Sequence, residues 1–180
     1  MGESTRGEAG REGVVGERVG ESGVFVMGEE VGAAGGTFKS FDGLFTEFGP
    51  ERVVDTPIAE EGYVGLGVGA AMTGMRPVID LMFGDFIAMA IDPVVNQAAK
   101  MYYMTGGQVT VPMVTHTTIR AGGRSAPQHS RSRHAWFAHV PGLMARLASR
   151  RSASTGVSVR AIRREGSRVT VEAYPYGAGS

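Results

Sequence analysis

The chain contains no cysteine among its 180 residues. This absence excludes a disulfide framework, a thiolate metal site and a cysteine nucleophile, and it suits a reducing compartment. Neither sign of charge is in excess, since 18 basic side chains balance 18 acidic ones, so nothing indicates binding to nucleic acid or to a membrane surface. No apolar run approaches the roughly 20 residues that cross a bilayer, and the polar N-terminus lacks the apolar segment of a signal peptide. We therefore expect a soluble, cytoplasmic protein.

The composition divides the chain into three parts. Residues 1–22 are rich in Gly, Glu and Arg, so we expect a disordered lead-in. Residues 23–143 hold nearly all of the aromatic residues and are expected to form one domain. Residues 144–180 carry seven Arg, no Lys and only two acids, and a shift of reading frame near codon 143 is one hypothesis for this change. Because its apolar residues alternate on either side of a polar turn, we expect this tail to form an exposed β-hairpin, or to be disordered.

Short apolar segments alternate with helical patterns in the central part. The predicted strands lie at 24–28, 51–56, 76–83 and 108–116, and the predicted helices at 60–74, 84–104 and from 134 onward. Near-continuous apolar strands are typical of a parallel sheet covered on both faces. The alternation therefore predicts an α/β domain with a mostly parallel sheet flanked by helices. Within 84–104, Asp92 and Pro93 fit an N-cap and a first helical position, which predicts a break between Ile91 and Val94.

The glycine-rich segment within residues 60–74 allows two interpretations. Gly65, Gly67 and Ala70 fit the GxGxxA pattern of a dinucleotide loop, but no strand leads directly into Gly65, so an NAD(P)-binding module is the weakest alternative. A helix is favoured, and its small residues then share one face: Gly62, Gly65, Gly69 and Thr73. Such a face indicates close approach of another backbone, either within the chain or in a neighbouring subunit. The sequence does not separate these two readings.

Four longer motifs carry a resemblance to a known family and stand in that family's order along the chain: "VFVMGEEV" (24–31), "VVDTPIAEEGYVGLGVGAAMTGMRPVIDLMFGDF" (53–86), "NQAAKMYYMTGGQ" (96–108) and "QHSRSRHAWFAHVPGL" (128–143). Together they resemble the beta chain of the thiamine-diphosphate-dependent 2-oxoacid dehydrogenases. The resemblance implies an incomplete transketolase-like pyrimidine-binding domain. It also implies an enzyme subunit, an oxidoreductase, that takes part in the oxidative decarboxylation of pyruvate or a branched-chain 2-oxoacid, with acyl transfer to a lipoyl carrier. Which 2-oxoacid is used does not follow.

The same resemblance implies partners and a cofactor. An alpha chain would share thiamine diphosphate with this chain, hold its Mg²⁺, and form an α2β2 heterotetramer with it. A lipoyl acyltransferase component would accept the acyl group. No metal ligands are expected in this chain, because its His and acidic residues lack metal-ligand spacing. The alternative is a truncated, catalytically inactive fragment that acts at most as a subunit-interaction module.

Five residues match functional positions of that family. Glu60 matches the glutamate that hydrogen-bonds a ring nitrogen of the aminopyrimidine and takes part in proton transfer there, and Glu29 matches a second acid beside it. Ile58 is expected at the cofactor site, and Phe86 matches the aromatic residue that lines the pyrimidine pocket. His129 matches a histidine near the substrate and the acyl-transfer chemistry. Glu60 and Glu61 each have an alternative interpretation, as an acid that stabilises a helix N-terminus. The alternative for Phe86 is a core residue.

Some residues near these positions are expected to play structural parts. His116, His134 and His139 lie on a predicted strand or helix, which favours structural or surface roles. Arg131 and Arg133 stand where the family usually has Gln and Leu. Arg133 would place a charge beside an apolar helix, which is costly unless the charge is paired or reaches water.

Overall fold

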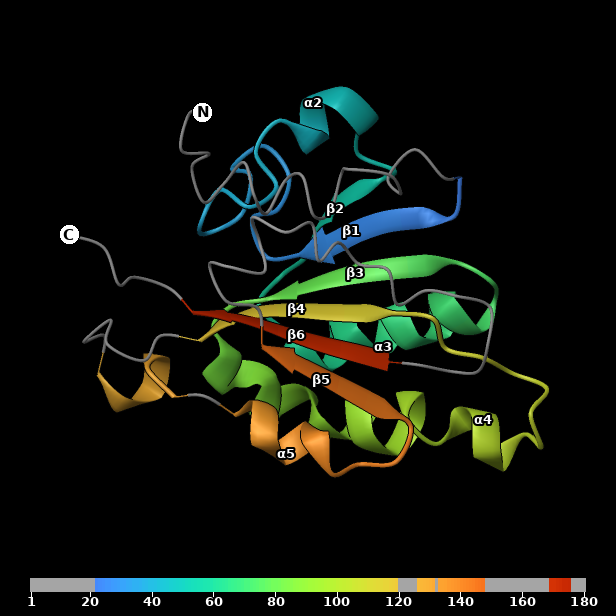
Figure 1. Cartoon of the computed structure of the whole chain (residues 1–180). Helices are drawn as coiled ribbons and strands as arrows, with labels where there is room; N and C mark the ends of the chain where they lie inside the picture. The colour runs from blue at the N-terminus through green and yellow to red at the C-terminus, as the bar shows by residue number, and fades with distance from the viewer. Residues whose placement is uncertain (1–21, 120–125, 132, 148–168, 176–180) are drawn as a thin grey trace, which may run out of the picture.

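A parallel β-sheet forms the centre of the molecule (Figure 1). The computed structural model describes residues 22–119, 126–131, 133–147 and 169–175. The described strands form a six-stranded sheet in the order β2-β1-β3-β4-β6-β5, and every neighbouring pair is parallel. They are β1 (Val24–Gly28), β2 (Val53–Asp55), β3 (Arg76–Leu81), β4 (Val114–Ile119), β5 (Leu143–Leu147) and β6 (Val169–Pro175). The predicted α/β class with a parallel sheet is confirmed.

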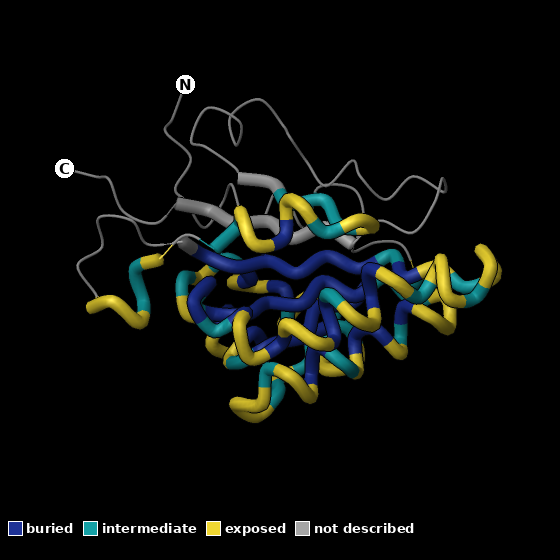
Figure 2. Tube along the Cα trace, turned by 90° about the horizontal axis from the view of Figure 1, so that it is seen from below, coloured by how far each residue is buried: buried dark blue, intermediate teal, exposed yellow. Residues whose placement is uncertain are grey.

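Helical segments cover both faces of this sheet. They are α2 (Leu44–Phe48), α3 (Glu60–Met72), the 3-10 helix η1 (Gly84–Ala90), the π-helix η2 (Asp92–Ala98), α4 (Met101–Met104), the short 3-10 turn η3 (Pro127–His129) and α5 (His134–Ala138). The larger core lies between one face of the sheet and α3, η1, η2 and α5. A smaller core lies on the opposite face, beneath α2 and the loop that precedes it. Where burial is coloured, Figure 2 shows mostly buried strands in the interior and exposed positions on the outer sides of the helices.

The alternation of side chains along the strands creates the two cores. In β1, Phe25 and Met27 face the larger core, whereas Val24 and Val26 face the smaller one. All five residues of β1 are buried, because this central strand is covered on both sides. Burial on both faces is the reason that β1 is continuously apolar in the sequence rather than alternating.

Most of the predicted elements are confirmed. The strand expected at 24–28 is β1, and the segments 51–56 and 76–83 contain β2 and β3. The helix expected at 60–74 is α3, and the one expected from 134 is α5. The segment 84–104 divides at Ile91, slightly before the predicted position between Ile91 and Val94: η1 ends at Ala90, η2 begins at Asp92, and Ile91 itself keeps a helical backbone. Asp92 differs from its predicted part as an N-cap: it lies in the first turn of η2, where its carboxylate accepts a hydrogen bond from the Asn96 side chain at 2.6 Å.

The fourth strand begins later than expected. The segment 108–116 was expected to be a strand, but β4 runs from Val114 to Ile119. Its pairing with β3 begins where Val114 lies opposite Val78. Pro112 has no backbone N–H to donate to a strand ladder. The buried apolar residues just before Val114 therefore lie in an irregular segment that leads into the strand.

The tail differs from the expected hairpin. The first expected arm, residues 156–162, lies outside the described residues. The second arm is β6, which pairs in parallel with β4 on one side and with β5 on the other. A strand whose two sides are both occupied by parallel neighbours has no free edge for an antiparallel partner. The expected lead-in at 1–22 lies outside the described residues except for its last residue.

The glycine-rich segment lies within α3, where no phosphate-binding turn between strand and helix can form. Apart from the neighbouring backbone of α3 itself, a β-carbon built at Gly65 or at Gly69 would meet no atom of the described residues within 4 Å. Close packing among the described residues is therefore not the reason for glycine at these two positions. Gly67 is different, because a β-carbon there would come within 2.7 Å of Ile79 in β3.

This difference predicts opposite results for two alanine substitutions on one helix. Gly69→Ala should raise the free energy of unfolding by about 0.5–1 kcal/mol, because alanine costs less backbone entropy in a helix. Gly67→Ala should lower it by roughly 1–3 kcal/mol, because the added methyl group overpacks the core against the buried Ile79. Urea unfolding of the two variants measures the difference. Equal stabilities would mean that Gly67 does not make the close contact with β3.

Candidate functional site at the carboxyl edge of the sheet

The predicted site residues follow the carboxyl ends of neighbouring strands. Glu29 follows β1, Glu60 begins the helix after β2, Phe86 lies in the helix after β3, and His129 lies in the turn η3, which follows β4 in the chain. Because the strands are parallel, their carboxyl ends lie at one edge of the sheet, where the arrowheads gather in Figure 1. Ligands of open α/β sheets bind at this edge.

The end of β1 is held close to its neighbours, which places Glu29. A β-carbon on Gly28 would lie 2.5 Å from the backbone oxygen of Asp80 in β3, so only glycine fits there. Beyond Glu29, the backbone N–H of Gly32 donates a hydrogen bond of 2.7 Å to the carboxylate of Asp55 at the end of β2. The loop that carries Glu29 is therefore tied to both strands that flank β1.

Glu29 and Glu60 lie close enough to influence each other. Burial raises the pKa of Glu29 above 4.5, and the neighbouring charge of Glu60 raises this pKa further. The hydroxyl of Tyr63, one turn along α3 from Glu60, donates a long hydrogen bond of 3.4 Å to the Glu29 carboxylate, which partly opposes that rise. Burial and these two carboxylates also raise the pKa of Tyr63, so its hydroxyl stays protonated as a donor. The structure therefore places the first turn of α3, which begins at Glu60, beside Glu29.

The raised pKa of Glu29 predicts a pH-dependent gain in stability when its charge is removed. Because the pKa of the folded state is higher than that of the unfolded state, stability from this group is present below pH 4.5 and is lost as the pH rises through the folded pKa. Glu29→Gln should therefore raise the thermal unfolding midpoint at neutral pH, and the gain should vanish in acid. Unfolding curves at several pH values, with the exposed Glu51→Gln as control, measure this. A variant less stable than the parent at pH 7 would contradict the prediction.

Phe86 and His129 are in contact. Their ring centroids are 5.3 Å apart and the rings are nearly perpendicular, at 88°. Phe83 lies on the same histidine, with ring centroids 5.0 Å apart, and Phe38 in turn meets Phe83 edge-on. Aromatic pairs favour this perpendicular geometry. His129 is therefore held by a cluster of phenyl rings. Phe38 and Phe83 were not predicted as site residues, although "LMFGDF" places two aromatic residues at a strand end.

Ile58 differs from the other predicted site residues in the exposure of its side chain. It lies between β2 and α3, beside the same edge of the sheet, but its side chain is 82% exposed. It lines no enclosed site within the described chain, and its part at a cofactor site stays a prediction that requires a partner surface.

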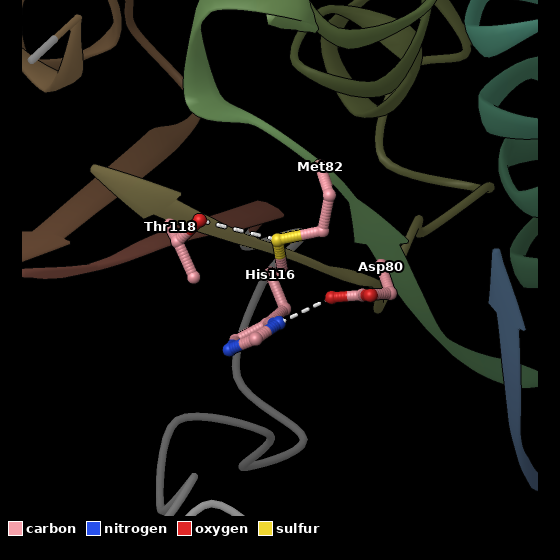
Figure 3. A network of polar contacts seen from close by, with 4 residues as sticks. All are labelled: Asp80, Met82, His116 and Thr118. Carbon is pink, nitrogen blue, oxygen red and sulfur yellow. Dashed lines mark hydrogen bonds and ion pairs between the residues drawn. The ribbon is translucent and has the colours of Figure 1, made fainter. Parts of the chain in front are cut away.

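A buried polar pair lies beneath this edge, on the face of the smaller core (Figure 3). His116 of β4 and Asp80 of β3 are register partners in the sheet, and the His116 Nδ1 lies 2.5 Å from the Asp80 carboxylate. Burial raises the pKa of Asp80, and the hydrogen bond to His116 opposes this rise. The hydroxyl of Thr118 donates to the sulfur of Met82 at 3.2 Å beside the pair. His116 is thus a structural group, as predicted, while His134 is half-buried and His139 is exposed.

Within the residues that the structure describes, no three His, Asp or Glu side chains are grouped so as to hold a metal ion. Within the same residues, no helix combines the length and apolar character needed to cross a membrane.

Comparison with known proteins relates the chain to several beta subunits. It is 49% identical over 136 residues to the pyruvate dehydrogenase E1 component subunit beta of Rhizobium meliloti (strain 1021), covering 76% of this chain and 30% of that one. It is 42% identical over 145 residues to the 2-oxoisovalerate dehydrogenase subunit beta of Bacillus subtilis (strain 168), covering 81% of this chain and 44% of the relative. The chain therefore spans less than half the length of these relatives.

Solved structures and family models agree on the fold. A chain described as split gene transketolase, inactive beta4 tetramer, superposes with a TM-score of 0.69 at 18% identity, over 96% of this chain and 52% of that chain. The family model described as transketolase, pyrimidine binding domain, matches residues 15–176. This match includes β5, β6 and most of the tail, which the sequence motifs alone left outside the family. Since the family model covers most of the chain, the protein belongs to the transketolase pyrimidine-binding domain family.

Proposed function

We propose that this chain supplies the pyrimidine-binding half of the active site in a thiamine-diphosphate-dependent 2-oxoacid dehydrogenase, as the beta chain of its decarboxylating component. The observation that carries the proposal lies at the carboxyl edge of the sheet. There Tyr63, one turn after Glu60 in α3, donates a hydrogen bond to Glu29, and the His129 ring contacts Phe86. Similarity to beta subunits of pyruvate and 2-oxoisovalerate dehydrogenases supports the same reaction class. The reaction would be oxidative decarboxylation of a 2-oxoacid with acyl transfer to a lipoyl carrier.

The residues present fit the pyrimidine end of such a cofactor. An aminopyrimidine ring needs an acid that exchanges a proton with a ring nitrogen and a flat apolar wall. Glu60 would supply the first, with Glu29 as a second, partly buried acid beside it. Phe86, half-buried against the larger core, supplies the second. When bound, thiamine diphosphate supplies the carbon nucleophile that attacks the 2-oxoacid.

Each residue then has a separate part. Glu60 binds the ring nitrogen and holds or releases the proton there, while Glu29 keeps negative charge beside it. Phe86 would orient the ring, and His129 would hold a proton near the substrate carbonyl and the incoming lipoyl disulfide, whose reduction to one thioester sulfur and one thiol balances the oxidation of the acyl group. The diphosphate and Mg²⁺ belong to an alpha chain in this proposal, and the assembly would be an α2β2 heterotetramer. A cytoplasmic location and a lipoyl acyltransferase partner are parts of the same proposal.

A second candidate is a subunit-interaction module without catalysis of its own. One observation favours it. A β-carbon added at Gly65 or Gly69 would meet no described atom outside the neighbouring backbone of α3, so this face of the helix could receive a helix of another subunit.

Co-expression with a cognate alpha chain separates the two candidates. The enzyme proposal predicts a stable complex that binds thiamine diphosphate in calorimetry and decarboxylates pyruvate or a branched-chain 2-oxoacid. A complex that forms but neither binds the cofactor nor decarboxylates any 2-oxoacid would favour the interaction module. Absence of any complex, with a folded chain confirmed by circular dichroism, would contradict both.

A further inference from the structure

The segment that carries His129 is attached to η1 in two ways. The first is the contact of the His129 ring with Phe83 and Phe86, which flank the start of η1. The second is a set of contacts to Asp85, which lies in the first turn of η1 between these two aromatic residues in the sequence. The aromatic wall and the anchor therefore belong to one short stretch of backbone, residues 83–86.

Asp85 is buried, and its carboxylate interacts with two residues that follow His129 in the chain. Its side chain is only 6% exposed. One carboxylate oxygen accepts a hydrogen bond of 3.1 Å from the backbone N–H of Arg131, 46 residues further along the chain. The other oxygen lies 3.7 Å from Nε of Arg133, which makes an ion pair but not a hydrogen bond.

The ion pair also accounts for the charge of Arg133 beside an apolar helix. The guanidinium lies 4.2 Å from the ring centroid of Trp136 in α5, within the range of a cation–π contact. Arg133 is therefore held between a buried acid and an aromatic ring. A buried carboxylate is unfavourable unless it is paired, so Asp85 stabilises the fold only while Arg131 and Arg133 stay in place.

We propose that Asp85 is a positioning residue, which holds residues 126–131 and Arg133 in place so that His129 lies edge-on to Phe83 and Phe86. The proposal rests on the proposed function only where it gives His129 a chemical part; the geometric claim stands without it. Arg131 acts through its backbone and Arg133 through its side chain, so their contributions can be separated. Asp85→Asn keeps an acceptor for the Arg131 N–H but loses the charge that pairs with Arg133, whereas Asp85→Ala loses both.

The test is the magnetic environment of His129 in the full chain. Proton–nitrogen spectra of the imidazole side chains, with the His129 signal assigned from His129→Gln, report ring-current shifts from the two phenyl rings. We expect Asp85→Ala to move the His129 signals toward random-coil values. Asp85→Asn and Arg133→Met should move them less, and Arg131→Ala, which keeps the backbone N–H, should leave them in place.

Several outcomes decide the proposal. Unchanged His129 signals in a folded Asp85→Ala chain would overturn it. If Asp85→Ala does not fold, Asp85→Asn and Arg133→Met decide by the same criterion, and no shift in either would overturn the proposal. In a complex with an active alpha chain, Asp85→Ala should lower kcat by up to roughly 100-fold with little change in KM, and Asp85→Asn should restore part of the loss. A parent complex without activity would count against the proposed function alone, because the spectra do not depend on activity.

Discussion

Replacing Glu60 by glutamine is expected to lower 2-oxoacid decarboxylation by the alpha–beta complex roughly 100- to 10,000-fold, the range that a positioned acid–base group contributes. Glutamine has nearly the same shape and can still form a hydrogen bond, but it cannot take up or release a proton at the ring nitrogen. The loss should therefore appear mainly in kcat rather than in assembly. Steady-state kinetics and thiamine diphosphate binding, measured on the same purified complex, separate these effects.

Glu61→Gln is the matched control for this prediction. Glu61 lies in the same first turn of α3, but its side chain is exposed. Both acids can stabilise the helix N-terminus, by about 0.3–1 kcal/mol each. If this were the whole part of Glu60, the two variants would behave alike. Full activity of the Glu60→Gln complex would show that Glu60 has no acid–base role.

Removing either partner of the buried Asp80–His116 pair should lower the free energy of unfolding by about 3–5 kcal/mol. Asp80 is almost fully buried and His116 nearly so, and they connect β3 to β4 in the middle of the sheet. Asp80→Ala leaves the imidazole without its carboxylate, and His116→Ala leaves a carboxylate in a dry environment. Because native domains are stable by only about 5–15 kcal/mol, either variant could lose most of its folded population at 37 °C.

Urea unfolding with linear extrapolation measures these effects, and two further variants define their cause. Replacing both residues by leucine should cost less than either single substitution, since no unpaired polar group then remains buried. The exposed Glu51→Ala should change the free energy of unfolding by less than about 0.5 kcal/mol. Single variants as stable as the parent would mean that the pair contributes no stability.

Local signals in the sequence account for much of the fold. The apolar run at 24–28 coincides with β1, because a central strand that is buried on both faces must be apolar at every position. The break near Ile91 followed from Pro93, whose ring and missing N–H act on the nearest turn. These features depend on residues within a few positions of one another. They could therefore be predicted without knowing how distant segments meet.

Part of the candidate site could be placed in the same way. Glu29, Glu60 and Phe86 each follow a predicted strand, and parallel strands end at one edge of a sheet. That His129 would rest on Phe83 could not be foreseen, because its segment joins η1 through contacts across more than 40 residues of sequence. For Arg133, the sequence predicted a charge beside an apolar helix but gave no partner for it.

The sequence by itself determined the α/β alternation, the motifs at the strand ends and the family that these motifs resemble. Only the tertiary structure decided that β6 lies between β4 and β5, that Asp80 pairs with His116, and that Gly65 and Gly69 face outward from α3. The physical reason is that periodicity fixes which side of an element is apolar, but not which distant element covers it. Strand order and side-chain pairing depend on contacts between remote residues, and these form only in the folded chain.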